Sequence, residues 1–457
     1  MTQYIHGGVN RRKFLGMTAA GTLMATASAN LFSRATAQSS RPNVVFILVD
    51  DMGWGDLSIY GRTDYETPNL DRLARQGVRF TNAYANQTVC TPTRIAFLTG
   101  RYQARLPVGL REPLGARSQP ASNNIGIPAN QPTIASLLKA NGYETALVGK
   151  WHAGYPPNFG PLQKGFDEYF GHLSGGIEYF THTGTDRILD LYENDVPVQR
   201  SGYVTDLFTD RAVEFIQRPH SRPFYLSLHY NAPHWPWQGP NDQASTAFYL
   251  TNGYTVGGSQ ATYAAMVKSL DDGVGRVLDA LEASGQADNT LVIFTSDNGG
   301  ERFSNFGPFR GQKASLYEGG IRVPAIIRYP GVTQANQVSN QVIITFDLTA
   351  TILAATGTSF HPNYPPDGQN LLPLLRGDRS EFSRTLFWRY GAALTTRQRA
   401  VRSGDWKYWR RGNQEALFNL ATDPGETTDL KDSNAQVFTR LRNQFQHWEL
   451  QMLPYGS

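Results

Sequence analysis

Four short apolar segments that each run directly into polar residues constrain the fold of this chain more than any other feature. The first, residues 43–49 (NVVFILV), is the kind of run that a parallel sheet buries on both faces, and Asp50 and Asp51 follow it. The other three end similarly: residues 146–148 lead to Gly149, Lys150, Trp151 and His152, residues 224–229 lead to NAPH with His234, and residues 291–295 lead to Ser296, Asp297 and Asn298. Because ligands gather at the carboxyl ends of strands in open α/β sheets, we predict one shared site, although each cluster alone is also a common turn composition.

Helical signals between these strands complete an α/β pattern. Thr67 and Pro68 open a predicted helix through Arg75 that Gly77 closes. Residues 262–283 carry an apolar stripe and predict a long amphipathic helix. The alternation predicts a mixed, mostly parallel sheet flanked by helices. We interpret His229, which continues one face of its strand, as a core or surface histidine.

The N-terminus has the features of a cleavable export signal of the twin-arginine type, spanning residues 1–37. Paired Arg11 and Arg12 precede a weakly apolar stretch, and small residues stand at positions 35–37. A signal of this type implies partnership with the twin-arginine export machinery of a bacterial cell and a periplasmic or secreted mature protein. An unstructured tail is the alternative.

Loss of residues 1–37 removes four of the 42 basic residues and no acidic one, so that 38 basic residues face 38 acidic ones. This balance gives no support for a nucleic-acid partner. No later apolar run reaches the length of a membrane span, so we expect no membrane anchor after cleavage.

The chain after the signal is long enough for two domains, because single cores seldom grow past about 250 to 300 residues. We predict a catalytic domain over residues 38–375 and a smaller C-terminal α+β domain over residues 376–457. Alternating residues and glycine turns in WRYG and RSGDWKYWRRG predict an antiparallel sheet, and residues 434–450 predict a closing helix.

Three carboxylates and one amide among the strand-end residues form a set of hard oxygen ligands, namely Asp50, Asp51, Asp297 and Asn298. Such a set suits Ca²⁺ or Mg²⁺ and is poor for zinc or copper. We favour Ca²⁺ because it tolerates irregular carboxylate geometry, and Mg²⁺ remains the alternative.

Cys90 is the only cysteine of the chain, so it cannot form an internal disulfide. Pro92 to Thr99 predict a helix ended by Gly100, which places residue 90 at a helix N-terminus, where anions are favoured. Arg94 lies one turn further along. The positive charges of Arg94, Lys150, Lys313 and a dication together exceed the negative charges of the three aspartates. This excess makes a pocket for a small oxyanion. The alternative is that Cys90 is a small buried apolar residue.

The run TVCTPTRIAFLTGR at residues 88–101 resembles the signature of the sulfatase family, of the alkaline phosphatase superfamily. The resemblance extends from Pro42 to about Asp429 and includes GKWH, RGQKASLYEGGIRVP, RSGDWKY and LFNLATDPGETTDL. It departs at Thr93, where many members have serine. It implies an alkaline-phosphatase-like fold and a sulfuric ester hydrolase of the arylsulfatase type. It also implies that a maturation enzyme oxidises Cys90 to formylglycine (3-oxoalanine).

The resemblance also implies roles for the site residues. Asp50, Asp51, Asp297 and Asn298 match the metal ligands, with residue 90 beside the metal, and Arg94 matches the partner of formylglycine. One hydroxyl of the hydrated aldehyde attacks sulfur, His234 and Lys313 assist the leaving alcohol, and His152 takes the proton that releases sulfate. Lys150 belongs to the same GKWH run. A further polar position corresponds to either Ser174 or His172.

Two other functions stay open at this point. A phosphodiester or phosphonate monoester hydrolase of the same superfamily would use a similar constellation. A catalytically silent carbohydrate-binding relative would use aromatic residues at 155–180, Trp235, Trp237 and 406–411, which are equally compatible with loop packing. The expected substrate is an aryl sulfate or a saccharide sulfate, including a galactosamine type. We interpret Arg410 and Arg411 as solvating a hairpin.

Overall fold

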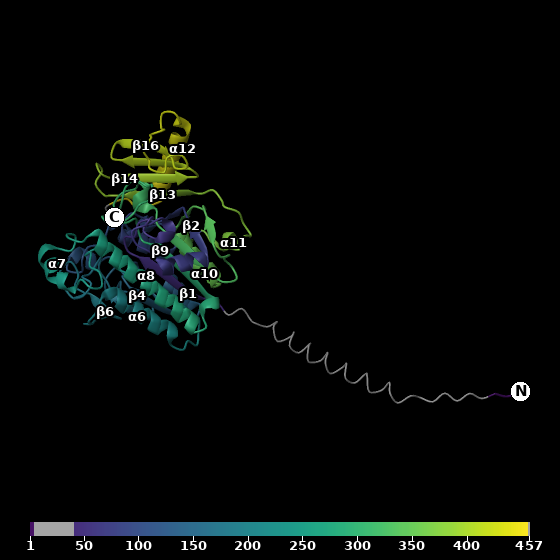
Figure 1. The fold of residues 1–457 in the computed structure, drawn as a ribbon. Coiled ribbons are helices and arrows are strands. Elements are labelled where there is room, and N and C mark those ends of the chain that lie inside the picture. The colour runs from purple at the N-terminus through teal and green to yellow at the C-terminus, as the bar shows by residue number, and fades with distance from the viewer. Residues whose placement is uncertain (4–40, 456–457) are drawn as a thin grey trace. The chain divides into compact units, whose positions relative to one another are not determined.

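The computed structural model describes residues 1–3 and 41–455, and the predicted export signal lies almost wholly outside them. Residues 42–457 form one compact unit, shown in Figure 1. Within the described residues, no helix has both the length and the apolar character that crossing a bilayer requires. The predicted domain boundary at residue 376 stays a prediction.

A 10-stranded sheet organises this unit, in the order β11-β2-β10-β9-β1-β8-β4-β5-β6-β7. The five strands from β9 to β5 are parallel, whereas β10 and the β5-β6-β7 edge pair antiparallel. This arrangement confirms the predicted mixed, mostly parallel sheet. The bounds are β1 Asn43–Val49, β2 Val78–Phe80, β4 Glu144–Gly149, β5 Glu168–His172, β6 Leu191–Glu193, β7 Val196–Pro197, β8 Phe224–His229, β9 Thr290–Ser296, β10 Ala325–Arg328 and β11 Gln337–Ser339.

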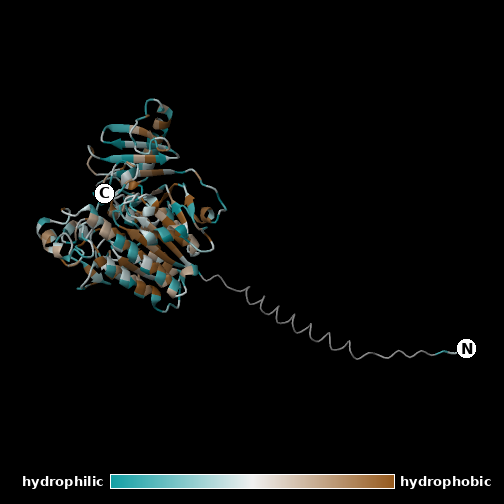
Figure 2. Ribbon diagram, in the orientation of Figure 1, coloured by the Kyte–Doolittle hydropathy of each residue, from teal (hydrophilic) through white to brown (hydrophobic). Residues whose placement is uncertain are grey.

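Strand β1 lies at the centre of the sheet because apolar side chains leave both of its faces. Val45, Ile47 and Val49 join one core cluster, to which α2 (Pro68–Arg75), α6 (Val204–Gln217) and α8 (Gln260–Ala283) contribute. Val44, Phe46 and Leu48 join a second cluster with α3 (Cys90–Thr99), α5 (Ile134–Ala140), α10 (Thr345–Ala355) and α11 (Leu372–Leu375). Figure 2 shows hydrophobic residues gathered along the central strands, with hydrophilic and hydrophobic residues alternating along the helices. The two predicted helices agree with α2 and α8.

The C-terminal part is a four-stranded antiparallel sheet covered by α12 (Ala435–Glu449), as predicted. Its strands are β13 Thr385–Tyr390, β14 Gln398–Ser403, β15 Trp406–Arg411 and β16 Gln414–Asn419. Trp388 and Tyr408 of this sheet share a core cluster with Tyr84 and Ala96, so the small sheet packs directly against residues that flank the start of α3.

The remaining elements are short. They are β3 Ala83–Tyr84 paired with β12 Ile343–Ile344, the helices α4 Pro120–Asn123, α7 Thr246–Asn252 and α9 Glu318–Ile321, and 3-10 turns at Ser58–Tyr60, Gln103–Arg105, Pro107–Leu110, Leu162–Lys164, Gln243–Ser245 and Ala287–Asn289.

Candidate active site

The polar residues that follow β1, β4 and β9 meet in one buried cluster, in which acidic and basic side chains contact each other directly. The Lys150 Nζ donates to Asp50 Oδ2 at 2.5 Å. The Asn298 Nδ2 and the Lys313 Nζ each donate to Asp51 at 2.6 Å. Apart from Lys313, whose side chain is 11% exposed, these residues are almost fully buried. The structure thus brings the strand-end residues together as the sequence predicted.

The backbone at this edge of the sheet is unusual at several points. Asp51 and His152 have positive φ angles of 64° and 51°, and Ala314, next to Lys313, has a φ of 66°. Such conformations are uncommon for residues other than glycine and concentrate at functional sites. Gly149 has a φ of 109°, and a Cβ there would lie 1.8 Å from the His229 carbonyl oxygen. Its missing side chain therefore allows the end of β4 to press against β8.

Cys90 is the first residue of α3, and its Sγ lies 3.2 Å from the His152 Nδ1. The other ring nitrogen of His152 lies 2.9 Å from the Leu114 carbonyl oxygen, which can only accept, so Nε2 carries the proton and Nδ1 is an acceptor. Burial, followed by the charge of Lys150, holds the pKa of His152 well below its ordinary value. Burial also raises the pKa of the Cys90 thiol. The pair is therefore neutral, with a proton acceptor facing residue 90.

Arg94 is fully buried and is held from three sides. Its Nε donates to Asp297 Oδ2 at 3.0 Å, and its Nη1 donates to the Lys150 carbonyl oxygen at 2.8 Å. Its Nη2 lies 2.9 Å from the same Asp297 oxygen without making a hydrogen bond, so one end of the guanidinium group keeps its donor capacity.

His229 contacts this arginine, which the sequence did not indicate. Its Nδ1 lies 3.2 Å from the Arg94 Nη1 and 3.1 Å from the Lys150 carbonyl oxygen, and its Nε2 lies 2.8 Å from the Ser227 Oγ. Burial, followed by the charge of Arg94, holds the pKa of His229 well below its ordinary value, so the ring is neutral. It is a buried core histidine that also braces Arg94.

Two buried oxygen atoms in the cluster accept no hydrogen bond, Asp50 Oδ1 and Asn298 Oδ1. Ligand atoms of Asp50, Cys90 and Asp297 lie within 4.8 Å of one another, and so do those of Asp50, Asp51 and His234. Burial, followed by the charge of Asp297, raises the pKa of Asp50 well above its ordinary value, so a bound cation would favour its ionised form. The donor set therefore fits a divalent cation that prefers oxygen ligands.

His234 and Lys313 carry the remaining nitrogen atoms of the site. The His234 Nδ1 donates to the Trp235 carbonyl oxygen at 2.7 Å, and its Nε2 lies 3.6 Å from Asp51 Oδ2. Burial, followed by the charge of Lys313, holds the pKa of His234 well below its ordinary value. Burial lowers the pKa of Lys313, but Asp51 and Glu301 outweigh that effect and raise it overall, so Lys313 stays protonated.

A cavity of about 240 Å³ opens onto this cluster. Ser174 lines it and His172 does not, because His172 is fully buried and stacks against Phe208. The lining comprises Cys90, Pro113, Leu114, Gly115, Ala116, Gln119, His152, Ser174, Gly175, Gly176, Thr185, His234, Trp235 and Lys313. The size suits a small oxyanion attached to a larger group outside the cavity.

Sequence reasoning missed several contributors to this site. The segment 113–119 supplies one wall of the cavity, and no motif marks it. Glu301, directly after the glycine pair that follows Asn298, lies 3.9 Å from the Lys313 Nζ. Burial and the charge of Asp51 raise the pKa of Glu301 to about 7. Its position beside the predicted metal ligands was the signal that could have identified it.

The aromatic residues considered for sugar stacking divide into two groups. Trp235 lies at the cavity, with its ring centroid 4.1 Å from that of His234. Trp237 packs against Phe303 inside the protein, and Trp409 is buried against Tyr317 at 4.5 Å. For Trp237 and Trp409, loop and core packing is therefore the correct interpretation.

Comparisons with known proteins agree with this geometry. A family model described as Sulfatase matches residues 42–358, and a model of the N-sulphoglucosamine sulphohydrolase C-terminal region matches residues 306–451. The N-acetylgalactosamine-6-sulfatase of Homo sapiens is 33% identical over 464 residues, which cover 90% of this chain and 86% of that protein. Arylsulfatase J of Mus musculus is 30% identical over 478 residues, which cover 92% and 77% of the two chains.

A solved structure gives the same result. Ps i-CgsB in complex with k-i-k-neocarrahexaose matches with a TM-score of 0.80 at 31% identity, over 91% of this chain and 94% of that chain. The family model spans more than half of this chain, and the relatives cover nearly all of it. The chain is therefore a member of the sulfatase family and hydrolyses sulfate esters.

Proposed function

We propose that this protein is an exported sulfatase that removes sulfate monoesters from saccharides, using a formylglycine made from Cys90 and a bound Ca²⁺. The observation that carries the proposal is the position of Cys90. It begins α3, lines the cavity, and faces both an unprotonated ring nitrogen of His152 and the oxygen-rich cluster around Asp50. A buried thiol with no chemical role would not require these neighbours.

The metal would be held by Asp50, Asp51, Asp297 and Asn298, with the side chain of residue 90 beside it. The unpaired oxygen atoms of Asp50 and Asn298 support this assignment. Ca²⁺ is favoured over Mg²⁺ because Ca²⁺ tolerates irregular carboxylate geometry, whereas Mg²⁺ demands a nearly ideal octahedron. When bound, such an ion polarises sulfate oxygens and acidifies a neighbouring hydroxyl group. Metal analysis of the purified protein, and recovery of activity after chelation with each ion in turn, tests the choice.

Formylglycine, as a hydrated aldehyde, supplies one hydroxyl group for attack on sulfur and a second for release of sulfate. The chain itself supplies the proton acceptor, because the Nδ1 of neutral His152 faces residue 90. The Leu114 carbonyl oxygen fixes the ring through Nε2. His152 therefore takes a proton from the side chain of residue 90 without any rotation of the ring.

The leaving alcohol is assisted by other basic residues of the site, of which Lys313 and His234 line the cavity. Lys313 is protonated and contacts Asp51, so it provides positive charge, and a proton, to the departing oxygen atom. The His234 Nε2 lies beside the same carboxylate and lines the cavity with it. Arg94 keeps one unused donor at Nη2 and adds positive charge next to Asp297.

A saccharide sulfate is the proposed natural substrate. Two relatives of high coverage support it: one is named for N-acetylgalactosamine 6-sulfate, and the other was solved with a neocarrahexaose. Aryl sulfates are expected to be turned over as well, because their leaving groups are good. Parallel rates on a nitrophenyl sulfate, the matching phosphate diester and sulfated saccharides distinguish a sulfatase from a phosphodiesterase.

Mass measurement of the peptide that contains residue 90 tests the central step. Protein expressed with a formylglycine-generating enzyme should carry the aldehyde at residue 90, and protein expressed without it should carry the thiol and be inactive. Full activity in protein that retains the thiol would overturn the proposal.

Export is proposed from Arg11 and Arg12, which lie outside the described residues. Because the twin-arginine route carries folded proteins, oxidation of Cys90 would precede export. Replacing both arginines with lysine should leave the precursor in the cytoplasm, as measured by cell fractionation.

A further inference from the structure

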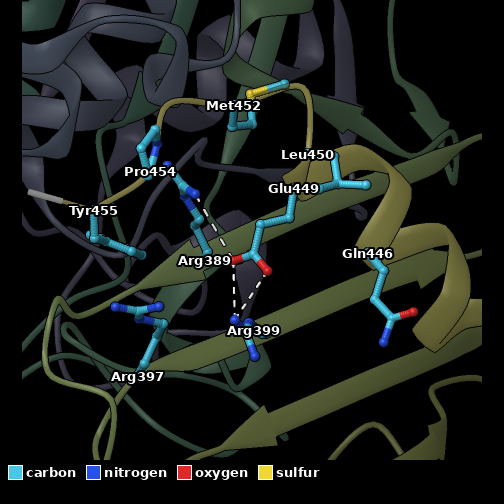
Figure 3. Close-up of a pocket in the computed structure, with 9 residues that line it drawn as sticks. All are labelled: Arg389, Arg397, Arg399, Gln446, Glu449, Leu450, Met452, Pro454 and Tyr455. Atoms are coloured by element: carbon cyan, nitrogen blue, oxygen red, sulfur yellow. Dashed lines mark hydrogen bonds and ion pairs between the residues drawn. The ribbon is translucent and has the colours of Figure 1, made fainter. Parts of the chain in front are cut away.

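A second cavity, of about 580 Å³, lies in the C-terminal part between the β13–β14 pair, the end of α12 and the last described residues. Three arginines line it, Arg389, Arg397 and Arg399, and Glu449 is the only acidic residue among its lining groups. Figure 3 shows the Arg389 and Arg399 side chains directed toward Glu449, and Arg397 close to Tyr455. We call this cavity the arginine pocket.

The three arginines of the arginine pocket outnumber the two carboxylates near them, Glu449 in the lining and Glu112 close by. Glu449 lies 3.0 Å from an Arg399 nitrogen and 3.9 Å from an Arg389 nitrogen, so one carboxylate serves two guanidinium groups. The Nε atoms of Arg389 and Arg399 are buried and make no hydrogen bond. The whole side chain of Arg389 is only 3% exposed. Buried unpaired donors are rare and costly, and planar guanidinium groups pair well with oxyanions.

The lining of the pocket includes one aromatic ring, that of Tyr455. The Tyr455 ring lies 4.5 Å from the Arg389 guanidinium carbon and 4.3 Å from that of Arg397. Leu450, Met452 and Pro454 complete an apolar side. A cavity lined by arginines, an aromatic ring in contact with two of them and apolar side chains suits a sugar ring that bears an oxyanion better than it suits a free inorganic ion.

Hydrogen bonds connect the backbone of the arginine pocket to the segment that lines the catalytic cavity. Gln87, three residues before Cys90, donates from Nε2 to the Arg389 carbonyl oxygen at 2.5 Å and to Glu112 at 3.1 Å. Glu112 also accepts from the Gly391 amide at 2.7 Å. The next two residues, Pro113 and Leu114, line the catalytic cavity. Glu112 therefore links the backbone at the end of β13, which carries Arg389, to the segment that lines the catalytic cavity.

We propose that the arginine pocket binds a second anionic group, a sulfate ester or a carboxylate, on a saccharide whose reacting sulfate lies at residue 90. The proposal rests on the saccharide substrate proposed above and adds that this substrate is a polyanionic oligosaccharide rather than an isolated sugar sulfate.

The first test compares substrates. Wild type, Arg397→Ala and Arg399→Gln are assayed on three compounds: a nitrophenyl sulfate, a hexasaccharide of N-acetylgalactosamine 6-sulfate and uronic acid, and a sulfated neocarrahexaose. The ratio of kcat/KM on an oligosaccharide to kcat/KM on the aryl ester should fall about tenfold in each variant, mainly through KM, because one charged hydrogen bond is lost. Arg411→Ala, which removes an exposed arginine outside the pocket, is the matched control.

The identity of the anion follows from the two oligosaccharides. If the kcat/KM ratio falls for both oligosaccharides, the pocket binds a sulfate ester, since the neocarrahexaose has no carboxylate. If the ratio falls only for the compound with uronic acid, the pocket binds a carboxylate. An unchanged ratio on both, or an equal fall in Arg411→Ala, would overturn the proposal while leaving the sulfatase function intact.

A binding measurement separates this inference from the proposed activity. Calorimetric titration of both hexasaccharides into Cys90→Ala protein, with and without Arg397→Ala, requires no turnover. We expect the affinity to drop about tenfold with Arg397→Ala. If the Cys90→Ala protein binds in an Arg397-dependent way and mature wild type desulfates neither hexasaccharide, the pocket stays assigned and the saccharide sulfatase is refuted. Absence of binding, or binding that does not depend on Arg397, would refute the pocket.

Discussion

The active site and the junction between the two sheets each bury a group of acidic and basic side chains, but they differ in whether every oxygen atom has a hydrogen-bond or ion-pair partner. In the active site, Asp50 Oδ1 and Asn298 Oδ1 have none. At the junction, the Lys407 Nζ lies 2.8 Å from Glu318 Oε1 and 2.9 Å from Glu426 Oε1. Glu426 Oε1 makes no hydrogen bond, but it forms an ion pair with Lys407. The second oxygen of Glu426 accepts from the Glu318 amide at 2.6 Å.

Arg322 completes the junction cluster, 3.3 Å from the other oxygen of Glu318. A buried charge is costly unless it is paired. A cluster in which the charges are paired can therefore join two parts of a protein, whereas a cluster with unpaired ligand atoms is suited to bind a ligand. Both clusters bury several charges. The oxygen atoms without a partner are what distinguish the active site from the junction cluster, which joins the two sheets.

The largest expected effect tests the chemical side of this comparison. Cys90→Ser, expressed in a host without a serine-converting maturation enzyme, should lose at least about ten-thousandfold in kcat, because the proposed aldehyde cannot form. The thermal midpoint should change little, since serine is close to cysteine in size. Steady-state rates on an aryl sulfate and a melting curve measure both. Multiple turnover by this variant near the wild-type rate would show that catalysis needs no aldehyde at residue 90.

The next largest effect tests whether the junction cluster holds the two sheets together. Lys407→Met leaves Glu318 and Glu426 facing each other in a buried site, which should lower the free energy of unfolding by about 3 to 5 kcal/mol. Denaturant unfolding measures it, and kcat per folded molecule should be unaffected. Lys431→Met, which removes an exposed lysine that pairs with Asp429 at the surface, is the control and should have a far smaller effect. If the two variants behaved alike, the junction cluster would not be holding the sheets together.

The positions at strand ends could be predicted from the sequence because they follow from local patterns. An apolar run such as residues 43–49 identifies a central strand, and the parallel arrangement then brings Asp50, Asp51, Asp297 and Asn298 to one edge. The helix over residues 90–99 was predictable from Pro92 and Gly100. The antiparallel C-terminal sheet was predictable from alternation and glycine turns.

Contacts between distant segments could not be predicted in the same way. Lys407 was considered only as part of an aromatic stretch, yet it is fully buried between two glutamates, because the small sheet contacts Glu318 at the start of α9 and Glu426. The contact of His229 with Arg94 depends on how α3 packs against the end of β8. Neither arrangement has a periodic or compositional signal, since each is decided by packing between elements far apart in the chain.

A smaller effect would refine the account of the active site. His229→Gln keeps a polar group next to Arg94 and Lys150 but removes the ring that braces the guanidinium group. We expect kcat to fall about tenfold with little change in KM, because misplacement of a catalytic group slows the chemical step more than binding. Steady-state kinetics on a small aryl sulfate tests this, with Ser227→Ala as a milder variant on the far side of the ring. A lower thermal midpoint with unchanged kcat would make His229 a core residue only.

The smallest effect concerns pH and the junction cluster. Burial, followed by the nearby Glu318, raises the pKa of Glu426 to about 7, although Lys407 opposes the shift. Burial raises the pKa of Glu318 too, but Lys407, Arg322 and Arg402 outweigh it and lower the pKa to about 2. The two carboxylates that share the Lys407 ammonium group thus have widely different pKa values. Because the pKa of Glu426 is higher in the folded state, its contribution to stability is present below about pH 4.5 and is lost as the pH rises through about 7.

Glu426→Gln removes this titration while other ionisable groups change equally in both proteins. The thermal midpoint of wild type minus that of Glu426→Gln should therefore be most positive near pH 5 and should decrease by a few degrees toward about pH 8. Calorimetric scans at constant ionic strength measure the difference. A difference that stayed constant over this range, or grew slightly with pH, would mean that Glu426 is ionised throughout. The junction would then carry a full buried charge triad, as the active site does, and the contrast between the two clusters would rest on the unpaired oxygen atoms of Asp50 and Asn298 alone.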